Sequence, residues 1–224
     1  MPMTLYPTRD YERDMAAAAL RRALGDADTA SALHPWDKAP FLAACDAYAA
    51  AGSARCACLG TKGATSAAMP AAERAFDRDL RLLVAALLDE KGRTQPRLLA
   101  ELLDGKLPSQ VIAGTCAEKV RRAGLLLERL PGHPELRGDP RRVSALAIST
   151  AALEAAVIAD READLALQTA LSAYREARLA FDKAYRRLVV MAQLLQNELF
   201  VLRHFPRFRR KKPATAANRE ARAE

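Results

Sequence analysis

The sequence predicts an all-α protein, a helical bundle in which shorter helices pack on a long C-terminal helix. Its 224 residues include 49 alanines and 32 leucines, but only 11 valines and isoleucines together. Alanine and leucine favour helices, whereas β-branched residues favour strands. No stretch alternates polar and apolar residues for long enough to indicate a strand. Residues 141–205 form a run of 65 residues without glycine or proline, which predicts a continuous helix over about 141–204.

Glycine and proline divide the N-terminal part of the chain into shorter segments. Two segments, 10–24 and 35–52, predict a pair of helices that makes up residues 1–52. The stretch 53–69 is small, polar and glycine-rich, so we expect a flexible linker there. The amphipathic segment 70–91 predicts a third helix, which begins the main bundle.

Two further segments precede the long helix. A short helix is expected over 95–103, and a longer one over 108–130. Within the longer segment, Thr115 and Glu118 have the spacing of a capping box, so its regular part is expected to begin at Thr115. Residues 131–140 contain three prolines and two glycines and are therefore a connector.

The long segment carries a heptad seam, in which apolar residues recur at alternate steps of four and three from Leu146. The seam suits burial under the shorter helices of a bundle over 70–205, or pairing with a second copy in a homodimer. The carboxylates of Asp160 and Asp164 interrupt it, and carboxylates are costly to bury. A bend or a solvated seam is therefore expected at 160–164. The side chains that would carry self-pairing are Leu167, Leu171, Tyr174, Phe181, Tyr185, Leu188, Leu195 and Leu199.

The net charge of +8 is concentrated at the C-terminus. Residues 203–224 contain eight basic and two acidic residues, so 206–224 is a basic tail on a nearly neutral protein. Basic residues attract phosphate and carboxylate groups, and exposed aromatic rings can stack on bases or enter a lipid interface. Alternatively, the phenylalanines close the end of the bundle and the bases only solubilise the tail. The residues predicted to contact a partner are Arg203, Phe205, Arg207, Phe208, Arg209, Arg210, Lys211 and Lys212.

No motif for catalysis, a metal or a cofactor is present, and we expect none of the three. The chain has no Glu-x-x-His pair, which a di-iron bundle requires, and no glycine-rich phosphate loop. Cys56 and Cys58 could hold a metal or form a redox pair, but their spacing is not that of a zinc site. We expect them to be free thiols, with Cys45 and Cys116 as small core residues.

Composition also bears on location. The first residues lack the apolar core of a signal peptide, and the longest uninterrupted apolar run, 82–88, is too short to span a membrane. We therefore expect a cytoplasmic protein with no transmembrane segment. The alanine- and arginine-rich usage is typical of bacteria with GC-rich genomes.

These observations favour a non-enzymatic helical scaffold or adaptor. It would assemble with another protein or with itself, and its basic tail would dock onto an acidic partner. The alternative is a nucleic-acid-binding protein that uses the tail, and binding to an anionic membrane surface is a further possibility.

Overall fold

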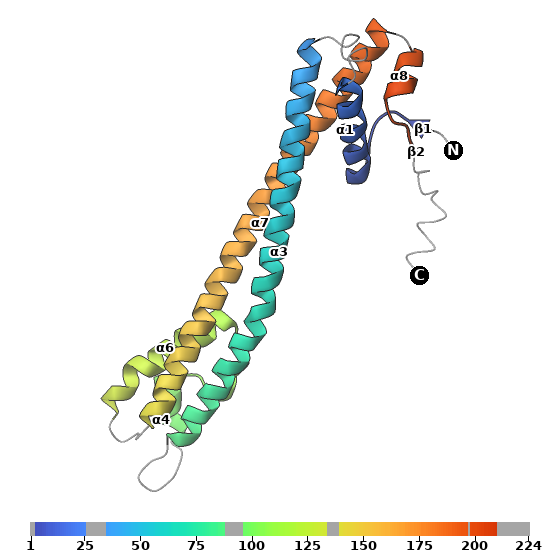
Figure 1. The fold of residues 1–224 in the computed structure, drawn as a ribbon. Coiled ribbons are helices and arrows are strands. Elements are labelled where there is room, and N and C mark those ends of the chain that lie inside the picture. The colour runs from blue at the N-terminus through green and yellow to red at the C-terminus, as the bar shows by residue number, and fades with distance from the viewer. Residues whose placement is uncertain (1–2, 26–34, 88–95, 134–138, 197, 210–224) are drawn as a thin grey trace, which may run out of the picture. The chain divides into compact units, whose positions relative to one another are not determined.

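The computed structural model describes residues 3–25, 35–87, 96–133, 139–196 and 198–209. These residues are helical apart from short connections and one pair of two-residue strands (Figure 1), which confirms the predicted all-α class. The helices are α1 (Asp10–Gly25), α3 (Pro35–Ala86), α4 (Pro96–Leu102), α5 (Pro108–Ile112), α6 (Cys116–Arg129), the 3-10 turn η1 (Leu130–Gly132), α7 (Pro140–Leu195) and α8 (Glu198–His204). The strands β1 (Met3–Thr4) and β2 (Phe208–Arg209) pair antiparallel.

The chain divides into two compact units. Unit 1 comprises Met1–Ala54 and Leu171–Glu224, and unit 2 comprises Arg55–Ala170. Both boundaries fall inside helices, so α3 and α7 each contribute residues to both units. The sequence places the whole long helix in one bundle with residues 70–130. Instead, its C-terminal part belongs with the N-terminal helices.

The core of unit 1 is aromatic. Phe41 of α3 lies between Phe181 and Tyr185 of α7, with ring centroids 5.9 and 6.3 Å away. Tyr48 packs on Phe181 at 5.4 Å and on Tyr174 at 5.3 Å. These contacts run in opposite directions along α3 and α7, so the two helices are antiparallel here. Other elements add buried side chains to this core: Ala16 and Leu20 from α1, Val201 from α8, and Phe205 and Phe208 from the segment that follows it.

The core of unit 2 is aliphatic apart from Phe76. Its buried residues come from α3, from α4 to α6, and from the first half of α7. The Arg122 guanidinium of α6 donates to the carbonyls of Leu103 (2.7 Å) and Asp104 (2.9 Å), just beyond the end of α4. Helix C-termini leave carbonyls without helical partners, so this buried arginine joins α6 to the end of α4. The fully buried members are Phe76, Leu80, Leu83, Leu87, Leu102, Leu103, Ala123, Leu126 and Leu146, with Leu153.

The predicted start of α6 is confirmed. The Thr115 hydroxyl accepts a hydrogen bond from the Glu118 backbone N–H at 3.3 Å, as an N-cap should. The Glu118 carboxylate pairs with Arg122 at 2.9 Å. The motif therefore caps the helix and also holds the arginine that meets α4.

The prediction of a flexible linker over 53–69 is wrong. The whole stretch is part of α3. Gly60 and Gly63 are exposed, and a Cβ at either would meet nothing within 4 Å, so packing does not require glycine there. A helical glycine costs about 1 kcal/mol relative to alanine. The neighbouring alanines and the contacts of this stretch with α7 offset that cost. Pro70 is likewise accommodated within α3, on an exposed face.

The long C-terminal helix is shorter than predicted. It ends at Leu195, and α8 begins separately at Glu198. After this break, α8 buries Val201 in the unit 1 core. By contrast, α7 continues without interruption through 160–164, where a bend or a solvated seam is predicted.

We expect the substitution Phe181→Ala to lower the free energy of unfolding by about 3–5 kcal/mol, because it empties the centre of the aromatic core. The matched control is Leu179→Ala, two residues away on α7, whose side chain is 63% exposed. The control should change stability by less than about 0.5 kcal/mol. Urea unfolding measures both, and equal losses would contradict this account of the core.

Candidate interaction surfaces

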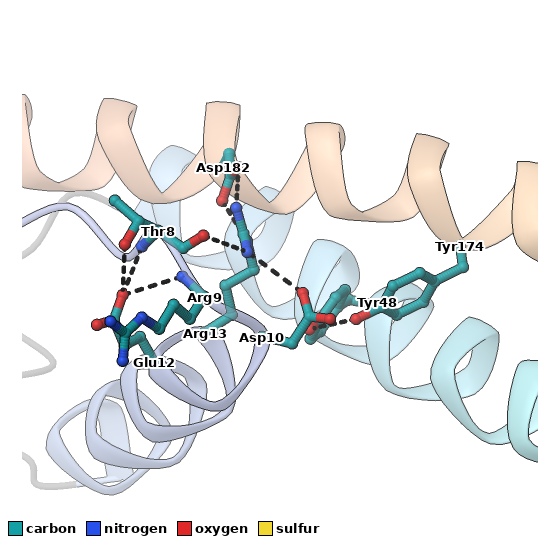
Figure 2. A network of polar contacts seen from close by, with 8 residues as sticks. All are labelled: Thr8, Arg9, Asp10, Glu12, Arg13, Tyr48, Tyr174 and Asp182. Carbon is teal, nitrogen blue, oxygen red and sulfur yellow. Dashed lines mark hydrogen bonds and ion pairs between the residues drawn. The ribbon is translucent and has the colours of Figure 1, made fainter. Parts of the chain in front are cut away.

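A buried ion pair joins α1 to α7 in unit 1 (Figure 2). The Arg13 guanidinium donates to both carboxylate oxygens of Asp182, through Nε and Nη2, each at 2.8 Å. The Arg13 side chain is only 7% exposed. Hydrogen bonding to Asp182 raises the pKa of Arg13, against the effect of burial. Arg13 therefore remains charged at neutral pH, and the pair holds α1 on α7.

The start of α1 and the aromatic core carry two more polar contacts (Figure 2). The Glu12 carboxylate accepts from the backbone N–H groups of Thr8 (2.7 Å) and Arg9 (2.9 Å), so it caps the helix. Burial raises the pKa of Glu12, but these hydrogen bonds outweigh burial and lower it overall. The hydroxyls of Tyr48 and Tyr174 lie 2.8 Å apart inside the core. Burial and the hydrogen bond to Tyr174 raise the pKa of Tyr48, so the Tyr48 hydroxyl is protonated at neutral pH.

Unit 2 has a buried lysine between two carboxylates. Lys119 Nζ donates to Glu73 Oε1 at 2.7 Å and to Asp77 Oδ1 at 2.8 Å, and its side chain is 2% exposed. Burial lowers the pKa of Lys119, but the two carboxylates raise it overall. A buried lysine serves as a base or a nucleophile only when its pKa is depressed. The arrangement is therefore a structural link between α6 and α3.

The polar interruption of the heptad seam is a specific contact. Asp160 of α7 accepts from Lys62 Nζ (2.8 Å), from the Thr65 hydroxyl (3.1 Å) and from the Ser66 hydroxyl (2.9 Å), all on α3. Lys62 Nζ also lies 3.9 Å from Asp164. The Lys62 hydrogen bond, with those of Ser66 and Thr65, lowers the pKa of Asp160 below its ordinary value of 3.8. The seam is thus closed by polar contacts at this point, and no bend is needed.

The four cysteines are free thiols in the structure. Cys56 and Cys58 lie in α3, and residues two apart on a helix point about 200° apart. Burial raises the pKa of Cys45 to about 11 and also raises that of Cys116, so these two remain thiols at neutral pH. Within the residues that the structure describes, no group of three or more His, Cys, Asp or Glu side chains could hold a metal ion.

Half of the predicted pairing seam is used inside the chain. Its central members lie in the core of unit 1 and are unavailable to a second copy: Tyr174, Phe181, Tyr185 and Leu188. Leu167 and Leu171 are half-buried. Leu195 and Leu199 are 49% and 76% exposed.

The predicted tail residues also divide into two groups. Phe205 and Phe208 are 3% and 4% exposed, and Phe205 contacts Tyr185 edge-on at 6.1 Å. The prediction that these rings contact a partner therefore conflicts with their burial. Arg203 and Arg207 are exposed, and the backbone of Arg209 pairs with β1. Arg210, Lys211 and Lys212 lie outside the described residues.

Exposed leucines gather where α7 gives way to α8. Leu194 is 75% exposed, and Leu195 and Leu199 lie within the next five positions. We call these three residues the corner leucines. The sequence shows Leu194 as one of several apolar residues near the end of the long segment, but a continuous helix to 204 does not predict that Leu194 is exposed.

A basic groove lies along α3 in unit 2. It has a volume of about 360 Å³ and is lined by Arg74, Asp77, Arg78, Arg81 and Leu82. The three arginines share one face of the helix at steps of four and three, a spacing that is visible in the sequence but was not singled out there. Two of the surrounding charges are already engaged, since Asp77 binds Lys119 and Arg78 pairs with Asp79.

One property of α7 concerns membranes. Among the described residues, it is the one helix long and apolar enough to cross a membrane, with an 18-residue window of mean hydropathy 1.6, of which 22% is buried. Core helices of water-soluble proteins can have the same length and apolar composition. The sequence expectation of no such segment counted only uninterrupted apolar runs.

Comparisons with known proteins add no assignment. No protein-family model matches the chain, and neither a curated protein nor a solved structure matches it. Any functional proposal therefore has to be argued from the surfaces described above.

We expect Asp182→Ala to lower the free energy of unfolding by about 3 kcal/mol or more, because Arg13 would remain buried without its main partner. The control is Asp46→Ala, which breaks the exposed pair between Arg21 and Asp46. That loss should stay below about 1 kcal/mol. Guanidinium unfolding compares the two variants. Similar losses of unfolding free energy would mean that the buried pair stabilises the protein no more than the exposed pair does.

The contact of Asp160 predicts a pH dependence. Since its pKa is lowered in the folded state, its stabilisation is complete above the ordinary value of 3.8 and is lost as pH falls through the folded pKa. The stability difference between wild type and Asp160→Asn should therefore be constant from neutral pH down to that region and shrink below it. Urea midpoints across acidic pH measure this, and a difference that does not shrink contradicts the assignment.

Proposed function

We propose that the protein is a non-enzymatic helical adaptor that binds an acidic protein. It would use the corner leucines together with the bases that follow them from Arg203 onward, which we call the basic stretch. The observation that carries the proposal is the exposure of Leu194 and Leu199, at 75% and 76%, within a few residues of the exposed bases Arg203 and Arg207. Exposed leucines that cluster beside polar residues are typical of protein interaction sites.

The start of the basic stretch is anchored. Phe205 and Phe208 are buried in the unit 1 core, and β2 pairs with β1 through Thr4 and Phe208. Bases that start from a fixed point lose less conformational freedom on binding than those of a free tail. This anchoring supports docking with a defined orientation, in which the leucines contribute apolar area and the bases steer an acidic partner.

An acidic protein fits this surface better than a nucleic acid does. Binding to single strands usually combines phosphate contacts with aromatic stacking. Phe205 and Phe208 are buried, so only phosphate contacts would remain at this end of the chain. Leucines, by contrast, suit the apolar centre of a protein interface. Nucleic-acid binding through the basic stretch remains the alternative function, and the basic groove on α3 is a second place where phosphate could bind.

We expect Leu199→Ser to weaken partner binding by about tenfold, and a chain truncated after Leu202 to lose it. The truncation also removes Phe205 and Phe208, so a full-length variant with Arg203 and Arg207 changed to Gln separates loss of charge from loss of packing. Leu179→Ser is the control, because Leu179 is exposed elsewhere on α7. The partner would be captured from a lysate of the source cells, purified and titrated by calorimetry at two salt concentrations.

The proposal is supported if Leu199→Ser and the arginine variant both weaken binding, and if higher salt also weakens it. Two other probes test the competing classes. If the chain binds single-stranded polynucleotide or phosphatidylserine vesicles, and the leucine variant binds them equally well, the basic stretch serves phosphate instead. A captured partner that is not acidic, or that binds both variants unchanged, contradicts the proposal.

A further inference from the structure

The outward face of α7 in unit 2 carries large apolar side chains that none of the described residues of the unit covers. Ile148, Ile158 and Leu165 are 69%, 50% and 57% exposed. They lie on the opposite side of the helix from Leu146 and Leu153, which are fully buried in the core. The exposed residues of this face follow one another at alternate steps of three and four: Ile148, Ala151, Ala155, Ile158, Glu162 and Leu165.

This spacing is that of a second heptad seam, which we call the outer seam. Steps of three and four place side chains where a partner helix packs between them. The outer seam differs from the seam predicted from the sequence, whose central positions, such as Phe181 and Tyr185, face the chain's own core. It also lies within residues 148–165, inside unit 2, and so is independent of the corner leucines and of the proposed function.

We propose that the outer seam pairs with the outer seam of a second copy of this chain, in antiparallel orientation. The argument comes from the charges beside the seam. Glu154 and Arg161 are seven residues apart, so both lie on the same flank, and both are exposed. In an antiparallel pair the same flanks of the two helices meet. Glu154 of each copy then faces Arg161 of the other, and the two-fold symmetry makes this contact twice.

The register that pairs these charges also fits the side chains of the seam. In two of the three kinds of opposed pair, a large apolar residue of one copy faces an apolar residue of the other. In the third, the Glu162 carboxylate faces an alanine, past which its side chain can extend to water. The opposed residues are Ile148 with Leu165, Ile158 with Ala155, and Glu162 with Ala151.

Other arrangements bring like charges together. A shift of one heptad in either direction places Glu154 opposite Glu154, or Arg161 opposite Arg161. A parallel pair in register places Glu162 opposite Glu162 across the seam. Like charges held opposite each other are destabilising, so the charges select one orientation and one register.

The second flank of the outer seam consists of alanines alone: Ala152, Ala159 and Ala166, all exposed. Small residues allow two helices to approach closely, because the distance between axes depends on the side chains at the contact. This flank contributes no charge that would oppose the pairing. The specific contacts therefore come from one flank and the close packing from the other.

A lipid bilayer is the competing occupant, since the apolar window of α7 is long enough to span one. Glu154, Arg161 and Glu162 lie on this surface or beside it, and Asp160 is bonded to Lys62 on the adjoining face. Charged side chains within hydrocarbon are costly. A second copy satisfies Glu154 and Arg161, whereas hydrocarbon satisfies neither.

The test uses the full chain and sedimentation velocity over a range of concentrations. We expect the wild type to be a dimer and Ile158→Glu to be monomeric. Glu154→Arg alone and Arg161→Glu alone should each weaken the dimer by about tenfold, because each replaces two attractive contacts by repulsive ones. The double variant E154R/R161E restores opposite charges and should return the dimer to near the wild-type dissociation constant. Leu59→Glu is the control, an exposed leucine of α3 in unit 2.

Each outcome either supports or contradicts the antiparallel pair. Weakening by each single reversal with recovery in the double variant supports the antiparallel pair. A wild type that stays monomeric at high concentration overturns it, as does a dimer that Ile158→Glu leaves intact. If Ile158→Glu separates the copies but the charge reversals have no effect, the proposed register is wrong. Flotation with lipid vesicles that Ile158→Glu abolishes assigns the face to a membrane instead. Circular dichroism checks that each variant remains helical.

Discussion

The packing of α3 against α7 is the constraint on which both units depend. Each core contains side chains from both helices, such as Phe41 and Phe181 in unit 1 and Phe76 and Leu153 in unit 2. Two helices bury only one stripe each, which rarely supports a stable core. The shorter elements supply the missing apolar surface. In unit 1 these are α1 and α8, and in unit 2 they are α4 to α6. Without the long pair, neither set of short helices would have a surface to cover.

Polar contacts then specify how the helices meet. Asp160 meets Lys62 and two hydroxyls across α7 and α3, and Asp182 meets Arg13 across α7 and α1. Hydrophobic packing is non-directional, so leucines and alanines alone would allow helices to slide. Arg13, whose side chain is 7% exposed, would be costly to leave without its partner, and a shifted register would separate both sets of partners. These polar pairs therefore favour one register between the helices.

The pattern of burial along the long helices determines which surfaces a partner can contact. The aromatic stripe of α7 is occupied within unit 1, so Phe181 and Tyr185 cannot also serve a partner. Among the described residues, the exposed apolar side chains include the corner leucines in unit 1 and the outer seam in unit 2. They differ in their surroundings. Bases follow the corner leucines, which suits a different, acidic protein, whereas the outer seam has charges of both signs, which suits its own copy. One chain can thus carry two independent contacts.

The sequence by itself determined the all-α class, the cap at Thr115 and the polar interruption at Asp160, because each follows from local propensity or from helical spacing. It also showed that Phe205 and Phe208 lie beside the bases, but not that they are buried. Tertiary structure decided that 53–69 is helical, since contacts such as Lys62 with Asp160 offset the weak propensity of its glycines. It decided the break after Leu195, where burial of Val201 favours a separate α8. It also decided which stripe of α7 faces inward and which stays exposed. Both stripes have heptad spacing in the sequence, and only contact with α3 and the short helices distinguishes them.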